Sequence, residues 1–139
     1  MKMPEFSIGM SKSVQKVITR EDTALNFGSG ALKNLLATPT LSALMIEATV
    51  KTIDPLLPDR YITIGKSIEI EHEHATKEGT TVTVSAELVE INGNVLSFKI
   101  TAVDEIGRIG TGYHVRQIVN YDILMKRVEE RCSVMEGRP

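Results

Sequence analysis

Residues 38–54 read TPTLSALMIEATVKTID, and this stretch decides the fold. The threonine–proline pair at its start is typical of a helix beginning, because threonine caps helices and proline is tolerated in the first turn. Asp54-Pro55 predicts the end of the helix. Apolar residues occupy two sides of the predicted helix, so we expect it to be largely buried. One stripe contains Leu41, Leu44, Met45 and Ala48, and the other contains Ile46, Val50 and Ile53.

Four strand-like segments follow the helix between residues 61 and 119, joined mostly by short turns. Short turns imply antiparallel neighbours. The alternation of polar and apolar residues slips at 89–91, which predicts a bulge, and Asn92-Gly93 predicts a tight hairpin. In the first segment we expect one face to carry every second residue. This face would hold Ile62, Ile64, Ile68, Ile70, His72 and His74.

The remaining segments complete the predicted architecture. Residues 6–19 predict a first strand, residues 20–37 form a variable segment, and residues 121–133 predict a polar C-terminal helix. A lone buried helix beside a long sheet requires the sheet to curl around it. The sequence therefore predicts a single α+β domain over residues 1–139, with a curved antiparallel sheet wrapped around the helix at 38–54.

Composition narrows the class of protein. The chain has 139 residues, 42% of them hydrophobic, which suffices for the core of one domain. A net charge of −2 with mixed signs does not indicate a nucleic-acid-binding surface, and no apolar run is long enough to span a bilayer. Cys132 is the single cysteine and cannot form an internal disulfide. We expect a cytoplasmic protein without nucleic-acid or membrane partners, whose few aromatic residues favour an oligomeric interface.

The residues with reactive side chains have both chemical and structural interpretations. His72 lies at the end of the apolar face of a predicted strand. It is either a catalytic base, since an imidazole titrates near pH 6.5, or a half-exposed residue with ordinary hydrogen bonds. Thr38 either positions a water molecule or simply caps the helix. Arg116 either binds a phosphate or carboxylate of a ligand or is solvated. Glu47 and Lys51 have the spacing of an ordinary exposed helix pair.

A metal site is a further alternative. His72 and His74 have the spacing of two ligands on one strand face, and His114 would supply a third. Such a site would belong to a metal-binding β-barrel of the cupin kind, and the buried helix before the sheet argues against that architecture. We therefore expect neither a metal nor another cofactor.

Three segments resemble a known family. ATPTLSALM at 37–45, GKSIEIEHEHAT at 65–76 and DEIGRIGTGYHVR at 104–116 are similar to hotdog-fold thioesterases of the fluoroacetyl-CoA thioesterase-like family. The resemblance covers roughly Leu35 to Val119. It implies a dimeric hotdog fold, with acyl-thioester sites at the dimer interface.

The resemblance also implies site residues. Thr38 matches a catalytic threonine of the family, His72 a catalytic histidine, and Gly65 a glycine beside the acyl carbonyl. Arg116 and His114 match an arginine and a histidine of the closing strand. The catalytic glutamate of the family falls on Ile46, and Glu47 follows one residue later, which is a rotation of about 100° on a helix.

The sequence leaves two functions open. In the first, the protein is a homodimer, or a tetramer, that hydrolyses a small or medium acyl-CoA by His-assisted attack of water. His72, Thr38 and Glu47 would be catalytic, and Gly65, Arg116 and His114 would bind substrate. In the second, the protein binds an acyl-CoA or acyl group without hydrolysing it, because Ile46 occupies the carboxylate position.

Overall fold

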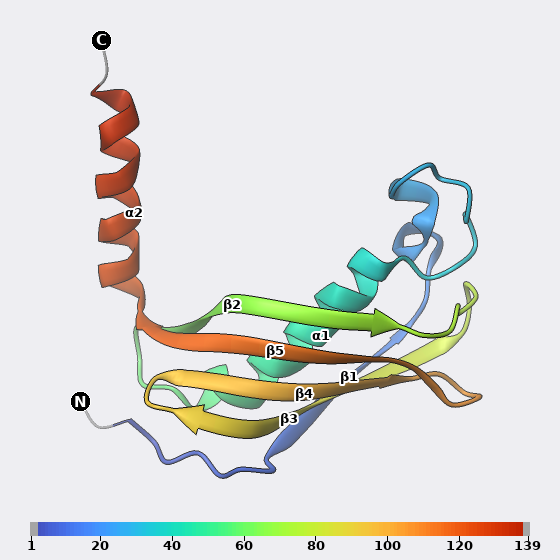
Figure 1. Ribbon diagram of the computed structural model, residues 1–139, viewed down its shortest axis with the longest axis horizontal. Coiled ribbons are helices and arrows are strands. Elements are labelled where there is room, and N and C mark those ends of the chain that lie inside the picture. Colours follow the sequence, from blue (N-terminus) through green and yellow to red (C-terminus); the bar gives the residue numbers. More distant parts are fainter. Residues whose placement is uncertain (1–2, 138–139) are drawn as a thin grey trace.

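The computed structural model describes residues 3–137 and places a curled sheet around one helix (Figure 1). Three one-turn 3₁₀ helices, Arg20–Asp22, Ala24–Asn26 and Asp54–Leu56, flank the central helix. The predicted helices and strands are present. In chain order they are β1 (Ser11–Val17), α1 (Thr38–Ile53), β2 (Tyr61–His72), β3 (Thr81–Asn92), β4 (Val95–Val103), β5 (Arg108–Asn120) and α2 (Tyr121–Glu136).

The sheet is antiparallel throughout and has the order β1-β3-β4-β5-β2. The hairpins β3–β4 and β4–β5 join neighbours through short turns, as the sequence predicts. Strand β2 pairs with β5 alone and therefore forms one outer edge of the sheet. This arrangement confirms the predicted hotdog fold.

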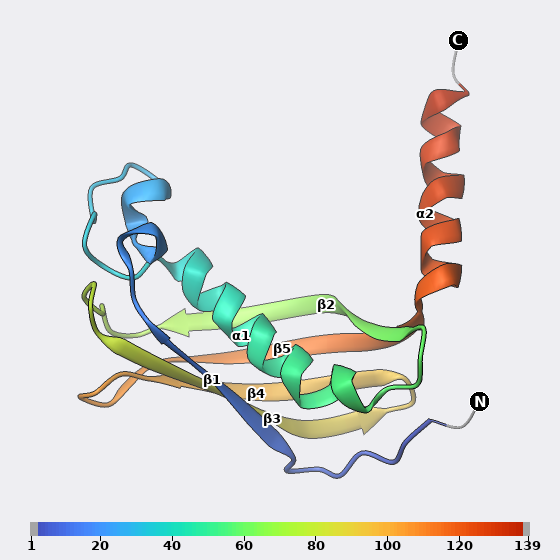
Figure 2. The ribbon, with the colours of Figure 1, turned by 180° about the vertical axis from the view of Figure 1, so that it is seen from behind.

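The core lies between α1 and the face of the sheet that it crosses (Figure 2). The first predicted stripe of α1 is buried throughout, whereas Ile46 and Val50 of the second are only half-buried. Gly112 of β5 lets the helix approach, since a Cβ there would come within 2.7 Å of Met45 Sδ. The strand residues that complete the core alternate along β3 and β4 as expected: Val82, Val84, Ala86, Leu88, Leu96, Phe98, Ile100 and Ala102.

The register of the sheet shifts at three places, one of them between Ala102 and Val103 near the end of β4. The register of β3 against β4 changes between Leu88 and Glu90, which confirms the predicted bulge. A second shift, between Gly65 and Ser67 of β2, was not predicted. The shift adds one residue to β2. Alternate residues after the bulge therefore point to the opposite face of the sheet from the one that an unbroken strand would give.

The second bulge corrects the predicted face of β2. Before the bulge, Thr63 and Gly65 face α1, opposite residues of β5 that face the core. After it, Ile68, Ile70 and His72 face α1. The expectation that Ile62 and Ile64 share a face with these three residues is therefore wrong, because the pleat restarts in the opposite phase.

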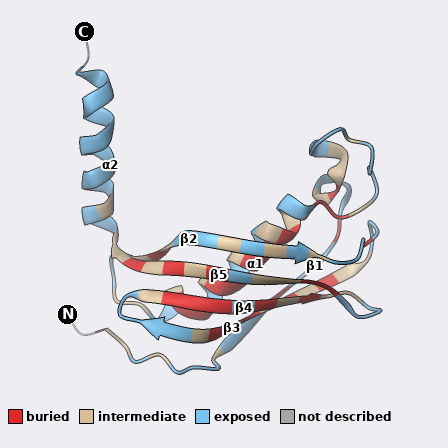
Figure 3. Cartoon of the chain, viewed as in Figure 1, coloured by how far each residue is buried: buried red, intermediate tan, exposed pale blue. Residues whose placement is uncertain are grey.

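The ends of the chain differ most from the sequence-based bounds. The first strand is shorter than residues 6–19 and comprises Ser11–Val17. Helix α2 continues past Cys132 to Glu136, and none of its residues is buried (Figure 3). Within residues 3–137 no helix has the length and apolar character that crossing a membrane requires.

Candidate active site

A hydrogen bond between Thr38 and His72 joins the start of α1 to the end of β2. The Thr38 Oγ1 lies 2.8 Å from His72 Nδ1. Ala37 occupies the N-cap position of α1, and no side chain caps the helix. The interpretation of Thr38 as the cap is therefore wrong, and its hydroxyl bonds to the imidazole instead. A hydroxyl at this distance from an imidazole is the pairing used to activate nucleophiles and water.

The two nitrogens of His72 have different surroundings. Nδ1 meets Thr38, whereas Nε2 is buried and has no hydrogen-bond partner among the described residues. Burial lowers the pKa of His72 below its usual 6.5, so the ring is neutral at pH 7. Buried polar atoms without partners are rare in folded proteins. A neutral imidazole in which one nitrogen has no hydrogen-bond partner is suited to accept or donate a proton in a reaction.

Thr38 and His72 border a cavity of about 470 Å³. The bridge Thr23–Leu36 closes the segment before α1 on itself, and the bridge Leu35–Lys77 attaches it to the loop after β2, so that this segment can form the other walls. The cavity is apolar with a few polar groups, as is usual for small-molecule sites. Its apolar residues include Ala24, Phe27, Leu32, Leu35, Leu36 and Ala37.

Three other predicted site residues form a second cluster near the middle of β2. Arg116 Nη1 donates to His114 Nε2 at 3.0 Å, and its Nε and Nη2 donate to Thr63 Oγ1 and Thr63 O at 2.7 and 2.8 Å. His114 Nδ1 donates to the Ser67 carbonyl at 2.7 Å. Gly65 lies beside this cluster, since a Cβ there would be 3.4 Å from His114 Cε1. The guanidinium N–H groups of Arg116 are thus largely used in hydrogen bonds to its own chain.

These bonds fix the protonation state of His114. Arg116 only donates and the Ser67 carbonyl only accepts, so Nδ1 carries the proton and Nε2 does not. Burial, and with it the positive charge of Arg116, lowers the pKa of His114. Burial also lowers the pKa of Arg116, against the opposite effect of the Asp54 carboxylate. His114 is therefore a neutral link between Arg116 and the bulge of β2.

Asp54 and Thr63 are members of this cluster that the sequence did not indicate. Thr63 Oγ1 donates to Asp54 Oδ1 at 2.6 Å while it accepts from Arg116. Asp54-Pro55 looks only like a helix end, and Thr63 stands between isoleucines that dominate the pattern. Only the position of the bulge, which turns Thr63 inward, could have revealed the contact.

The two clusters are separate within one chain. His72 lies seven positions after Gly65 on β2, which corresponds to roughly 20 Å along an extended strand. Within one chain, the structure therefore places Thr38 beside His72, and it places Gly65 beside His114 and Arg116. The two clusters do not contact each other.

Glu47 belongs to neither cluster. Its side chain is exposed, and no hydrogen bond or ion pair involves it among the described residues. The expected partner Lys51 donates instead to the Ser13 carbonyl at 3.1 Å. Ile46 is half-buried on the neighbouring side of the helix. No carboxylate of the described chain therefore bonds to Thr38 or His72.

The histidines of the alternative metal site do not converge. His74 follows the end of β2, where its backbone N–H donates to the Ile109 carbonyl, and it borders a different surface pocket from His72. His114 lies in the second cluster. Over residues 3–137 no group of three histidine, cysteine or acidic residues is placed to hold a metal ion.

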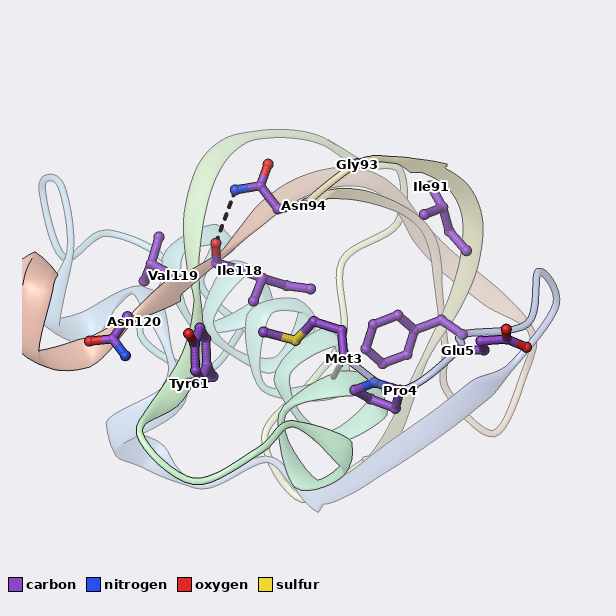
Figure 4. Close-up of a pocket in the computed structure, with 11 residues that line it drawn as sticks. Met3, Pro4, Glu5, Tyr61, Ile91, Gly93, Asn94, Ile118, Val119 and Asn120 are labelled. Carbon is purple, nitrogen blue, oxygen red and sulfur yellow. Dashed lines mark hydrogen bonds between the residues drawn. The ribbon is translucent and has the colours of Figure 1, made fainter. Parts of the chain in front are cut away.

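A larger cavity, of about 620 Å³, lies at the opposite end of β2 (Figure 4). Its walls include Met3, Tyr61 and Ile118, and its amides are already engaged. Asn94 Nδ2 donates to the Ile118 carbonyl, and Asn120 caps α2. Because it has no pair comparable to Thr38 and His72, we assign the candidate active site to the smaller cavity.

Comparison with known proteins agrees with this geometry. The model of the FlK family, described as fluoroacetyl-CoA-specific thioesterase, matches residues 18–122. The fluoroacetyl-CoA thioesterase of Streptantibioticus cattleyicolor is 33% identical over 97 residues, which are 70% of each chain.

Solved structures show the same fold. A hot-dog-like protein from Thermanaerovibrio acidaminovorans superposes with a TM-score of 0.86 at 28% identity, over 91% of this chain and 93% of the other. A fluoroacetyl-CoA thioesterase variant solved in complex with acetyl-CoA gives 0.84 at 26% identity, over 91% and 98%. The family match spans the helix, all the strands from β2 to β5 and both clusters, and the chain therefore belongs to the fluoroacetyl-CoA-specific thioesterase family.

Proposed function

We propose that this protein hydrolyses a small or medium acyl-CoA thioester, with His72 as the base that activates water and Thr38 as the group that orients the ring. The observation that carries the proposal is the 2.8 Å contact between Thr38 Oγ1 and His72 Nδ1 at the wall of an apolar cavity. Family membership, and relatives named as fluoroacetyl-CoA thioesterases, support the same reaction class.

The reaction follows from the state of His72. In the proposed reaction the neutral ring carries its proton on Nδ1 and donates it to the Thr38 hydroxyl, so that Nε2 accepts a proton from water while the water oxygen bonds to the thioester carbon. The carbon–sulfur bond of the tetrahedral intermediate then breaks. The CoA sulfur leaves with the proton that His72 had taken, which restores the neutral ring and releases the free acid.

We further propose that the active unit is a homodimer in which two β2 edges pair antiparallel. Strand β2 is an outer edge, and its residues at 65–67 are exposed. A two-fold axis between Ile68 and Glu69 would place Gly65 of one copy opposite His72 of the other. The Gly65 cluster would then complete the site, with a backbone N–H near the developing oxyanion.

An assay against a panel of acyl-CoAs tests the proposal. The panel should run from acetyl and fluoroacetyl to medium-chain thioesters. Because Cys132 is an exposed free thiol, released CoA should be measured by chromatography rather than with a thiol reagent. We expect turnover with at least one member and a loss of about 10²-fold or more in His72→Ala. Glu47→Gln is the matched control and should retain activity, because that side chain is exposed.

A second candidate function is acyl-CoA binding without hydrolysis. It is favoured by the absence of a carboxylate bonded to Thr38 or His72 among the described residues. Calorimetric binding of acyl-CoA, with no turnover above His72→Ala on any panel member, would establish this function and exclude the first. Ile46→Glu, which restores a carboxylate at the family position, should then introduce hydrolysis.

A further inference from the structure

Helix α2 is attached to the rest of the described chain at its first turn, where Arg60 pairs with Asp122 and lies over the Tyr121 ring. It has no buried residue, and Figures 1 and 2 both show it rising from the end of β5 past the outer edge of β2. One side of the helix is nevertheless apolar over its full length, within an arc of roughly 100°. This α2 stripe comprises Tyr121, Leu124, Met125, Val128, Cys132 and Met135.

A second set of exposed apolar side chains lies at the other end of the sheet, which we call the His72 end. Ile106, in the β4–β5 turn, is 97% exposed and borders a surface pocket with His74. Phe27 and Leu32 are also exposed and line the cavity of Thr38 and His72. Exposed apolar side chains that border a cavity are candidates for contact with a partner.

Helix α2 cannot cover the His72 end of its own chain. Asn120, the residue before α2, pairs with Tyr61 at the start of β2. The 12 residues of β2 span roughly 40 Å, whereas the 16 residues of α2 span roughly 24 Å and point away from the strands. Antiparallel pairing of two β2 edges removes this separation, because the start of each strand then lies beside the end of the other.

We propose that α2 is an arm that packs its apolar stripe on the His72 end of a second copy of this chain, beside the cavity that holds Thr38 and His72. The inference rests on the proposed β2–β2 homodimer. Both exposed apolar sets become covered, and each cavity receives a wall from the partner. The two arms do not pair with each other, because they start at opposite ends of the paired strands.

Cross-linking tests the arm on the unmodified protein. Lys126 lies on α2 outside the stripe, and Lys77 lies in the exposed β2–β3 loop at the His72 end. A short amine-reactive reagent should join them in a mixture of normal and ¹⁵N-labelled protein, and mass spectrometry should show that the joined peptides come from different chains. A Lys126–Lys126 product in place of this link would indicate paired arms and overturn the proposal.

A pair of variants tests the role of the stripe. Val128→Glu places a charge on the stripe, whereas Val134→Glu places one about 120° around the helix, at a position that is more exposed (61% against 43%). We expect the Lys126–Lys77 link to fall at least fivefold in Val128→Glu and to persist in Val134→Glu. Equal yields in the two variants would refute packing through the stripe.

Parallel measurements separate this inference from the proposed function. Light scattering reports the dimer, and the acyl-CoA assay reports hydrolysis. A dimer that hydrolyses acyl-CoA but gives no Lys126–Lys77 link disproves the arm alone. A link without hydrolysis disproves the thioesterase and leaves the arm. A monomer at assay concentrations overturns both the dimer and the arm.

Discussion

At the scale of single residues, the proposed chemistry depends on His72, because its two nitrogens have different surroundings. Nδ1 is held by Thr38 while Nε2 has no partner in the described chain. A base that is already neutral near pH 7 needs no nearby carboxylate to be functional, although a carboxylate would stabilise the imidazolium that forms. The exposed position of Glu47 is therefore compatible with slow hydrolysis.

The pH dependence of hydrolysis follows from the lowered pKa of His72. Burial holds this pKa below 6.5, and only the neutral ring accepts a proton from water. We expect kcat/KM to rise with pH through a midpoint below 6.5 and to become level at higher pH. A pH–rate profile measures this directly. A midpoint above 6.5 would contradict the assignment of His72 as a buried neutral base.

Arg116 is expected to matter for stability through its internal hydrogen bonds. Arg116→Lys keeps the charge but cannot reach both Thr63 and His114, which leaves buried acceptors unpaired. We expect the free energy of unfolding in urea to fall by about 1–3 kcal/mol. Arg108→Lys, on the same strand with an exposed ion pair to Glu73, is the control and should change it by less than about 0.5 kcal/mol. Equal effects would show that the buried cluster is not stabilising.

Among the secondary-structure elements, β5 depends on glycine where α1 crosses it. A Cβ at Gly110 would come within 2.7 Å of the Glu71 carbonyl oxygen and 3.3 Å of Leu41 Cδ2. The carbonyl is part of the backbone of β2, so it cannot shift without a cost in free energy. Gly110→Ala should therefore lower the free energy of unfolding by about 1–3 kcal/mol, measured by chemical denaturation. Gly107→Ala, where a Cβ would meet nothing within 4 Å, is the matched control. A neutral Gly110→Ala variant would mean that β2 and β5 separate easily there.

The same elements show what the sequence could predict. The core faces of β3 and β4, the bulge near Val89 and the start of the helix at Thr38 follow from local patterns that the structure bears out. The bulge in β2 has no such local pattern, because isoleucines occur at even positions on both sides of it. Its consequence, an inward Thr63 that accepts from Arg116, was therefore missed.

The candidate site was only partly predictable for a related reason. The Thr38–His72 pair was proposed from the resemblance, but their contact depends on how a helix and a distant strand meet. The cavity walls come from residues 23–37, which have no regular period and are held by two isolated bridges. Long-range packing, rather than local preference, decides such a segment.

For the whole molecule, the proposed dimer predicts that stability depends on protein concentration. A dimer that is favoured over its unfolded chains gains stability by mass action, so Tm should increase as the protein is concentrated. Thermal unfolding across a dilution series measures the effect, and light scattering on the same samples follows the molecular mass. A Tm that is independent of concentration, with a monomeric mass throughout, would contradict the dimer.

The uncapped start of α1 has an electrostatic consequence for the proposed reaction. The aligned peptide dipoles of a helix place roughly half a positive elementary charge at its first turn, and here no side-chain oxygen of an N-cap residue offsets it. His72 meets that turn through the Thr38 hydroxyl. The field of the helix therefore opposes a permanent imidazolium and favours negative charge that develops on a bound carbonyl. The backbone of α1 would thus assist thioester cleavage without contributing a charged side chain.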